Sequence, residues 1–128
     1  MDYSAFIILL TGIYAISASI GELRSPGMWA SMIDNLADVT ALRFITGIVL
    51  IVMGGVAYAV GSWDMSDWVP VIVKVLGAWM VIEGALFLAV GDLFIEFGRR
   101  MMGAATKLWV SLSLLMGIAF VIAAALRF

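Results

Sequence analysis

Four apolar runs divide the chain, and most charged residues lie in the connections between them. The runs cover about residues 4–20, 42–60, 69–90 and 108–126. A helix of about 20 residues crosses the hydrocarbon core of a bilayer, and none of the runs alternates as a membrane β-strand does. The pattern therefore predicts an all-α integral membrane protein with four transmembrane helices in a single membrane domain, residues 1–128.

Composition narrows the possible chemistry. The 128 residues are 65% hydrophobic and 12% charged, and they include neither cysteine nor histidine. Thiol redox chemistry, imidazole catalysis and the usual ligands of haem, zinc and copper are therefore unavailable to this chain. We also find no nucleophile motif or phosphate-binding loop, so we expect no enzyme, no metal and no cofactor. The net charge of −2 gives no basic surface for nucleic acid.

Basic residues favour one side of the membrane. The two longer connections, about residues 21–41 and 91–107, together with the start of the second run, hold five of the seven basic residues: Arg24, Arg43, Arg99, Arg100 and Lys107. The positive-inside rule predicts that both connections are cytoplasmic in a multi-pass protein of the cell (inner) membrane, with both termini outside. Trp63 and Trp68 then fall in the aromatic belt of the outer interface.

Both longer connections have helical periodicity. In the first, apolar residues including Trp29 and Met32 alternate with a polar face that holds Asp34 and Asp38. In the second, Phe94 and Phe97 recur in the same way, opposite acidic residues and the pair Arg99 and Arg100. We expect Trp29, Arg99 and Arg100 at the membrane interface, on short helices that lie in it. The alternative is that these segments are polar extensions of the spanning helices.

The two halves of the chain are similar to each other. A shift of 65 residues aligns Gly12 with Gly77 and Ser19 with Gly84, and a shift of 63 aligns Gly54 with Gly117. Each half, about residues 4–61 and 69–126, then contains a span, an interfacial helix and a second span. Because each half has two spans, the pattern predicts two repeats of parallel orientation, related by a pseudo-two-fold axis along the membrane normal.

Small residues recur at intervals of seven in all four runs. Lipid gives no hydrophobic drive for helices to associate, so small residues that let two backbones approach closely are typical of helix contacts in membranes. The candidate packing positions are Gly12, Ser19, Gly47, Gly54, Gly61, Gly77, Gly84, Gly91 and Gly117.

Short motifs resemble a known family. The segment from Pro26 through Trp29 to Met32, followed by Arg43 and a glycine-bearing span, is similar to the YjeT-like family of short two-span bacterial inner-membrane proteins. In the second half, Glu83 and Gly84 match the Glu-Gly pair of that family. The first half has Ala18 and Ser19 at the Glu-Gly positions, and the second has Gly91 and Phe94 instead of Pro and Trp. The resemblance implies a tandem duplication of unknown function.

Glu83 is the main candidate for chemistry, since it lies inside the third run. A carboxylate at bilayer depth costs roughly 2.5–3.5 kcal/mol, so it must face protein or water, or take up a proton. One interpretation is a neutral acid that hydrogen-bonds to Ser17, Thr46, Ser111 or Ser113. The others are contact with a basic group of a partner and transport of a proton or cation.

Two classes of function follow. We favour a non-catalytic accessory subunit that packs in a larger membrane complex, because the chain has small residues at helix-packing spacing, almost no soluble mass and no catalytic motif. The alternative is a small oligomeric transporter or channel that uses Glu83. The expected partners are the lipid bilayer and either other membrane subunits or further copies of this chain.

Overall fold

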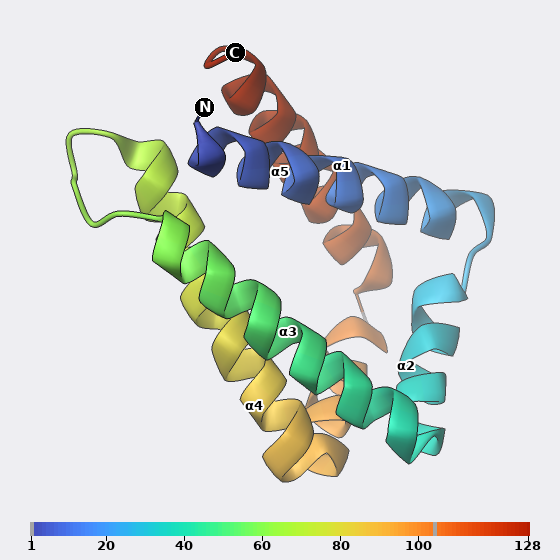
Figure 1. The fold of residues 1–128 in the computed structure, drawn as a ribbon. Helices are drawn as coiled ribbons and strands as arrows, with labels where there is room; N and C mark the ends of the chain where they lie inside the picture. The colour runs from blue at the N-terminus through green and yellow to red at the C-terminus, as the bar shows by residue number, and fades with distance from the viewer. Residues whose placement is uncertain (1, 104) are drawn as a thin grey trace.

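The computed structural model describes residues 2–103 and 105–128, which form five helices (Figure 1). Their bounds are α1 Tyr3–Arg24, α2 Met28–Asp38, α3 Thr40–Val60, α4 Trp68–Gly103 and α5 Thr106–Ala125. Four of them, α1, α3, α4 and α5, are long and apolar enough to cross a membrane. The predictions of an all-helical fold and of four spans are thus confirmed.

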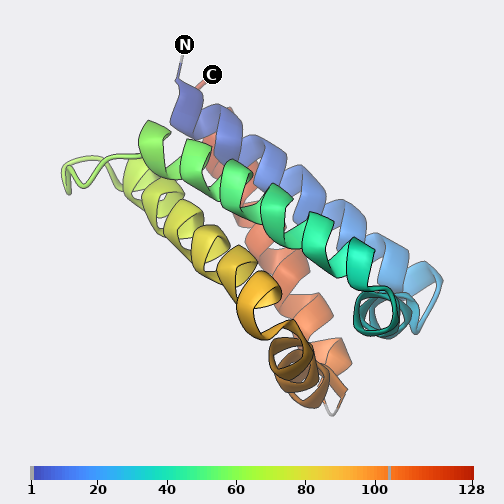
Figure 2. The ribbon, with the colours of Figure 1, turned by 60° about the horizontal axis from the view of Figure 1, so that its bottom comes forward.

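The spanning helices pack in two pairs, α1 with α5 and α3 with α4. Figure 2 shows α3 and α4 next to each other, and α5 passing behind. Glycines form the closest contacts in both pairs. A Cβ atom added to Gly12 would lie 2.8 Å from the Gly117 carbonyl oxygen, and one added to Gly54 would lie 2.7 Å from the Gly77 carbonyl oxygen. The two backbones touch at these points, so cohesion within each pair comes from close helix packing rather than from large interlocking side chains.

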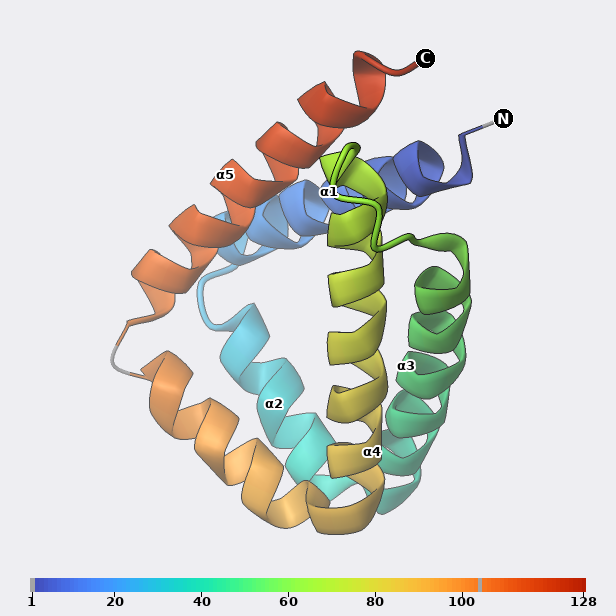
Figure 3. The same ribbon diagram turned by 90° about the vertical axis from the view of Figure 1, so that its left-hand side faces the viewer.

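Helix α4 continues through the second long connection but changes direction. Val90 has non-helical dihedral angles (φ −137°, ψ 43°), and beyond it the chain turns sharply and remains helical to Gly103 (Figure 3). The connection is therefore a helix that continues from the span through a kink. It combines the two forms expected from the sequence, a separate short helix and an extension of the spanning helix. The first connection contains a separate helix, α2, as predicted, and Arg99 of the second connection donates to Asp34 of α2 at 2.9 Å.

The two helix pairs meet at the end of the molecule that holds both termini (Figure 3). A small buried core lies there, formed by Ile8, Ala57, Val69, Val73 and Ala124. Towards α2 the pairs diverge (Figure 1). Few side chains are fully buried elsewhere, as expected for a protein whose outer surface contacts lipid instead of water.

Candidate functional site

Glu83 lies in the second half of the straight part of α4, which runs from Trp68 to the kink at Val90. By helical spacing it lies at the edge of the buried stripe that includes Val73 and Gly77, and its own side chain is half-buried. The structure gives the Glu83 carboxyl no hydrogen-bond partner among residues 2–103 and 105–128. The polar group is thus held at membrane depth without compensation from the part of the chain that is described.

Most of the hydroxyl groups expected to hydrogen-bond to Glu83 either bond to another group or are exposed. Thr46 donates to the carbonyl oxygen of Leu42 in its own helix at 2.8 Å. Ser17 and Ser111 are exposed. A hydroxyl that bonds back to the preceding turn is satisfied without a neighbouring helix. The hydrogen bond predicted between Glu83 and one of these residues or Ser113 is absent from the described structure.

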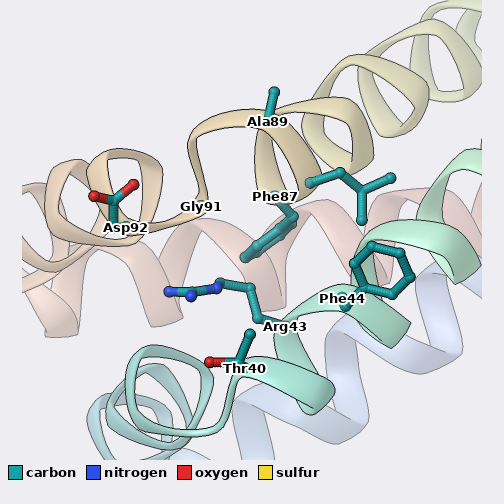
Figure 4. A pocket seen from close by; sticks show the side chains of 8 residues that line it. Thr40, Arg43, Phe44, Phe87, Ala89, Gly91 and Asp92 are labelled. Carbon is teal, nitrogen blue, oxygen red and sulfur yellow. The ribbon is translucent and has the colours of Figure 1, made fainter.

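A cavity of about 220 Å³ opens where α3 begins and α4 kinks. Its lining comes from the first turns of α3 and from the residues that flank the kink: Thr40, Arg43, Phe44, Phe87, Leu88, Ala89, Gly91 and Asp92. Figure 4 shows the Arg43 side chain reaching past Gly91 into this space, while the Asp92 side chain points away from it. The cavity therefore presents a guanidinium group beside aromatic rings.

Gly91 makes room for Arg43. A Cβ atom at position 91 would lie 2.7 Å from Arg43 Cδ and 3.0 Å from Arg43 Nε. Arg43 is half-buried, and it forms no ion pair with a carboxylate of the described residues. Its charge is thus available to a bound anion.

The remaining small residues singled out from the sequence lie along the helix pairs. A Cβ atom at Gly47 would be 2.9 Å from the Gly84 carbonyl oxygen, and one at Gly61 would be 2.6 Å from the backbone nitrogen of Lys74. Ser19 is fully buried and donates to the Ala15 carbonyl oxygen at 2.7 Å. Of the nine positions, all but Gly61, which is half-buried, are buried.

The predicted interfacial residues lie at the two ends of the bundle. Trp29 donates its indole N–H to the Ala18 carbonyl oxygen at 3.0 Å, which ties α2 to α1. Trp63 and Trp68 are more than half exposed at the opposite end. Arg99 and Arg100 both pair with Glu96, at 3.4 Å and 3.5 Å.

Sequence reasoning missed the role of Glu22. This carboxylate is buried, and it accepts hydrogen bonds from the backbone nitrogens of Gly27 (3.0 Å) and Trp29 (2.9 Å) at the start of α2. A negative charge at a helix N-terminus satisfies free N–H groups and complements the helix dipole. The acidic residue shortly before Pro26-Gly27 was the signal that could have identified this cap.

Sequence reasoning also missed Arg127, which joins three segments. It donates to Asp2 at 2.8 Å and to Asp67 through two nitrogens, one of them at 2.8 Å. The Arg127 guanidinium holds the pKa of Asp67 below its usual range. For Asp2, the hydrogen bond from the Ala5 backbone N–H is the larger cause of a lowered pKa, and Arg127 adds to it. Both termini and the turn before α4 are thereby fixed together.

Within the described residues, no three acidic side chains come close enough to hold a metal ion. No family model, curated protein or solved structure matches this chain. The resemblance to the YjeT-like family therefore stays a prediction that depends on the short motifs quoted above.

Proposed function

We propose that this protein is a non-catalytic accessory subunit that packs in a larger complex of the cell membrane. The observation that carries the proposal is Glu83, a carboxyl group at membrane depth without a hydrogen-bond partner in the described chain. A hydrogen-bond donor would stabilise an intramembrane acid of this kind, and a basic or polar side chain of another subunit would supply one. The glycines at intervals of seven already pack against neighbouring helices of the same chain. We therefore assign the contact with the partner subunit to Glu83.

We further propose that the two halves are repeats of parallel orientation. The ion pair between Asp34 and Arg99 supports this, because these residues are 65 positions apart and thus equivalent under the shift that aligns the halves. A contact between equivalent residues must lie on the two-fold axis that relates them. Asp2 and Asp67 are also 65 apart, and both bind Arg127. In addition, α1 begins at Tyr3 and α4 at Trp68.

The contacts between glycines are related by the same two-fold symmetry of the halves. Gly12 packs on Gly117, and Gly77 packs on Gly54. The shift of 65 carries Gly12 to Gly77, and the shift of 63 carries Gly54 to Gly117, so each pair maps onto the other. The first span of either half thus packs against the second span of the other half, as in an intertwined dimer made from one chain.

The proposed orientation follows from charge. The two longer connections, at or near which five of the seven basic residues lie, would face the cytoplasm and the termini would lie outside, in the inner membrane. The contacts of Arg127 with Asp2 and Asp67 support a common side for the termini and the α3–α4 turn.

The second candidate is a small oligomeric transporter or channel. The free carboxyl of Glu83 also favours this reading, since acidic residues within spans carry protons and cations in transporters. A bundle of four helices fills its own centre with side chains, however, and a pathway would have to form between copies.

The test is to purify the protein gently from its native membrane and determine its partners by native mass spectrometry. We expect a foreign subunit at fixed stoichiometry. Glu83→Gln should reduce the recovery of that subunit about tenfold without a change in thermal stability, since one charge-assisted hydrogen bond is lost. Asp38→Asn, at an exposed acid at the end of α2, is the matched control. A homo-oligomer without foreign subunits would favour the transporter, and full recovery with Glu83→Gln would contradict the role of Glu83.

A further inference from the structure

We propose that the cavity at the kink of α4 binds the phosphate head group of an anionic phospholipid, with Arg43 as the main ligand. The proposal does not depend on the protein being an accessory subunit; it rests on the surroundings of Arg43, and its choice of a lipid also uses the membrane orientation proposed above. The cavity volume of about 220 Å³ is several times the ~30 Å³ that one water molecule occupies in the liquid. A phosphate group therefore has enough room.

The chemistry of the lining selects an anion. Arg43 presents a planar guanidinium, which matches two phosphate oxygens at once, and no carboxylate of the described residues neutralises it. The Thr40 hydroxyl lies on the same wall and can donate a further hydrogen bond. Asp92 would repel an anion, but its side chain points away from Arg43 (Figure 4).

The apolar part of the lining selects a lipid over a free anion. Phe44, Phe87 and Leu88 stand beside Arg43, and Phe44 is 54% exposed on the outer surface of α3. A phospholipid would place its acyl chains along this exposed apolar surface while its phosphate meets the guanidinium. Inorganic phosphate would leave the exposed surface of Phe44 and Leu88 uncovered.

The location in the fold is that of a lipid head group. The cavity lies where α3 starts and where the straight part of α4 stops, so it is at the end of the predicted spans. Five of the seven lysines and arginines lie at or near this same end, and the cytoplasmic leaflet, which this end would face in the proposed orientation, carries the anionic lipids that attract such residues. The smaller cavity near Arg99, about 100 Å³, lacks this character because Arg99 already binds Asp34.

The binding test uses the full chain in detergent. Native mass spectrometry would measure the binding of phosphatidylglycerol and of phosphatidylcholine with equal acyl chains. We expect preferential binding of phosphatidylglycerol, and a loss of about tenfold or more in Arg43→Gln. Lys107→Gln is the matched control, since Lys107 is an exposed basic residue of the same end. Equal losses in the two variants would indicate general charge attraction and would overturn the proposal.

Two further measurements separate the remaining outcomes. Arg43→Lys keeps the charge but removes the planar fork, so it should fold as the wild type does and bind phosphatidylglycerol with intermediate affinity. It therefore tests the site even if Arg43→Gln is unstable. Inorganic phosphate at millimolar concentration should not displace the lipid. If it displaces the lipid and stabilises the protein equally well, the site is one for soluble anions and the lipid assignment is wrong.

Discussion

The contact between α3 and α4 predicts a large difference between two neighbouring glycines. A Cβ atom at Gly54 would lie 2.7 Å from the Gly77 carbonyl oxygen, 2.7 Å from Met80 Cβ and 2.8 Å from the Val81 nitrogen. Ordinary van der Waals contact starts at 3.4 Å, so the helices must separate by more than half an ångström. At Gly55 nothing lies within 4 Å of such an atom. The two positions therefore differ in the room available for a methyl group, but they lie in the same helix and at nearly the same depth in the membrane.

The size of the effect follows from two opposing terms. Overpacking costs typically 1–3 kcal/mol, and replacing glycine with alanine inside a helix gains roughly 0.5–1 kcal/mol. Gly54→Ala should thus lower the free energy of unfolding by roughly 1–2 kcal/mol, whereas Gly55→Ala should be neutral or slightly stabilising. Reversible unfolding by titration with a denaturing detergent, followed by circular dichroism, measures both variants. If Gly54→Ala proved as stable as Gly55→Ala, the close backbone contact would be wrong.

Two further predictions concern charges at the ends of the bundle. Asp34→Arg or Arg99→Asp alone should lower stability, and the double exchange should restore only part of the loss, because Arg99→Asp also removes the ion pair with Glu96; since this pair is exposed, a coupling of only about 0.2–1 kcal/mol is expected from a double-mutant cycle. The pKa of Asp67 is lowered by Arg127, so its contribution to stability is present above the ordinary carboxyl pKa, near 3.8, and is lost as pH falls through the lowered value. Thermal scans below about pH 4 should therefore show weaker acid sensitivity in Arg127→Gln than in the wild type.

The spans were predictable because their signal is local. Length and hydropathy define each span, and these depend on consecutive residues only. The pairing of the spans was not predictable from spacing, since all four carry small residues at intervals of seven. The same spacing allows Gly12 to meet Gly54, Gly77 or Gly117, and only the folded structure distinguishes Gly117.

The site residues were predictable to a lesser degree. Glu83 stands out because an acidic residue within an apolar run is rare. Arg43 gave no such signal: it sits at the edge of a span, where arginine is ordinary, and its cavity depends on the kink at Val90 in a helix far along the chain. Arg127 likewise gains its role from Asp2 and Asp67, which are 125 and 60 positions away.

The proposed repeat also bears on the choice between subunit and transporter. Two separate identical chains would bring like charges together on their two-fold axis, whereas the fused halves have Asp34 opposite Arg99 and so attract each other. In the proposed repeat the halves are also unequal within the membrane, since Ala18 occupies the position equivalent to Glu83. If a proton or cation moved along the pseudo-two-fold axis within one chain, only one of the two halves would contribute a carboxyl group, that of Glu83, to the pathway. A single carboxyl group on one flank instead suits one contact with one partner, which favours the accessory subunit.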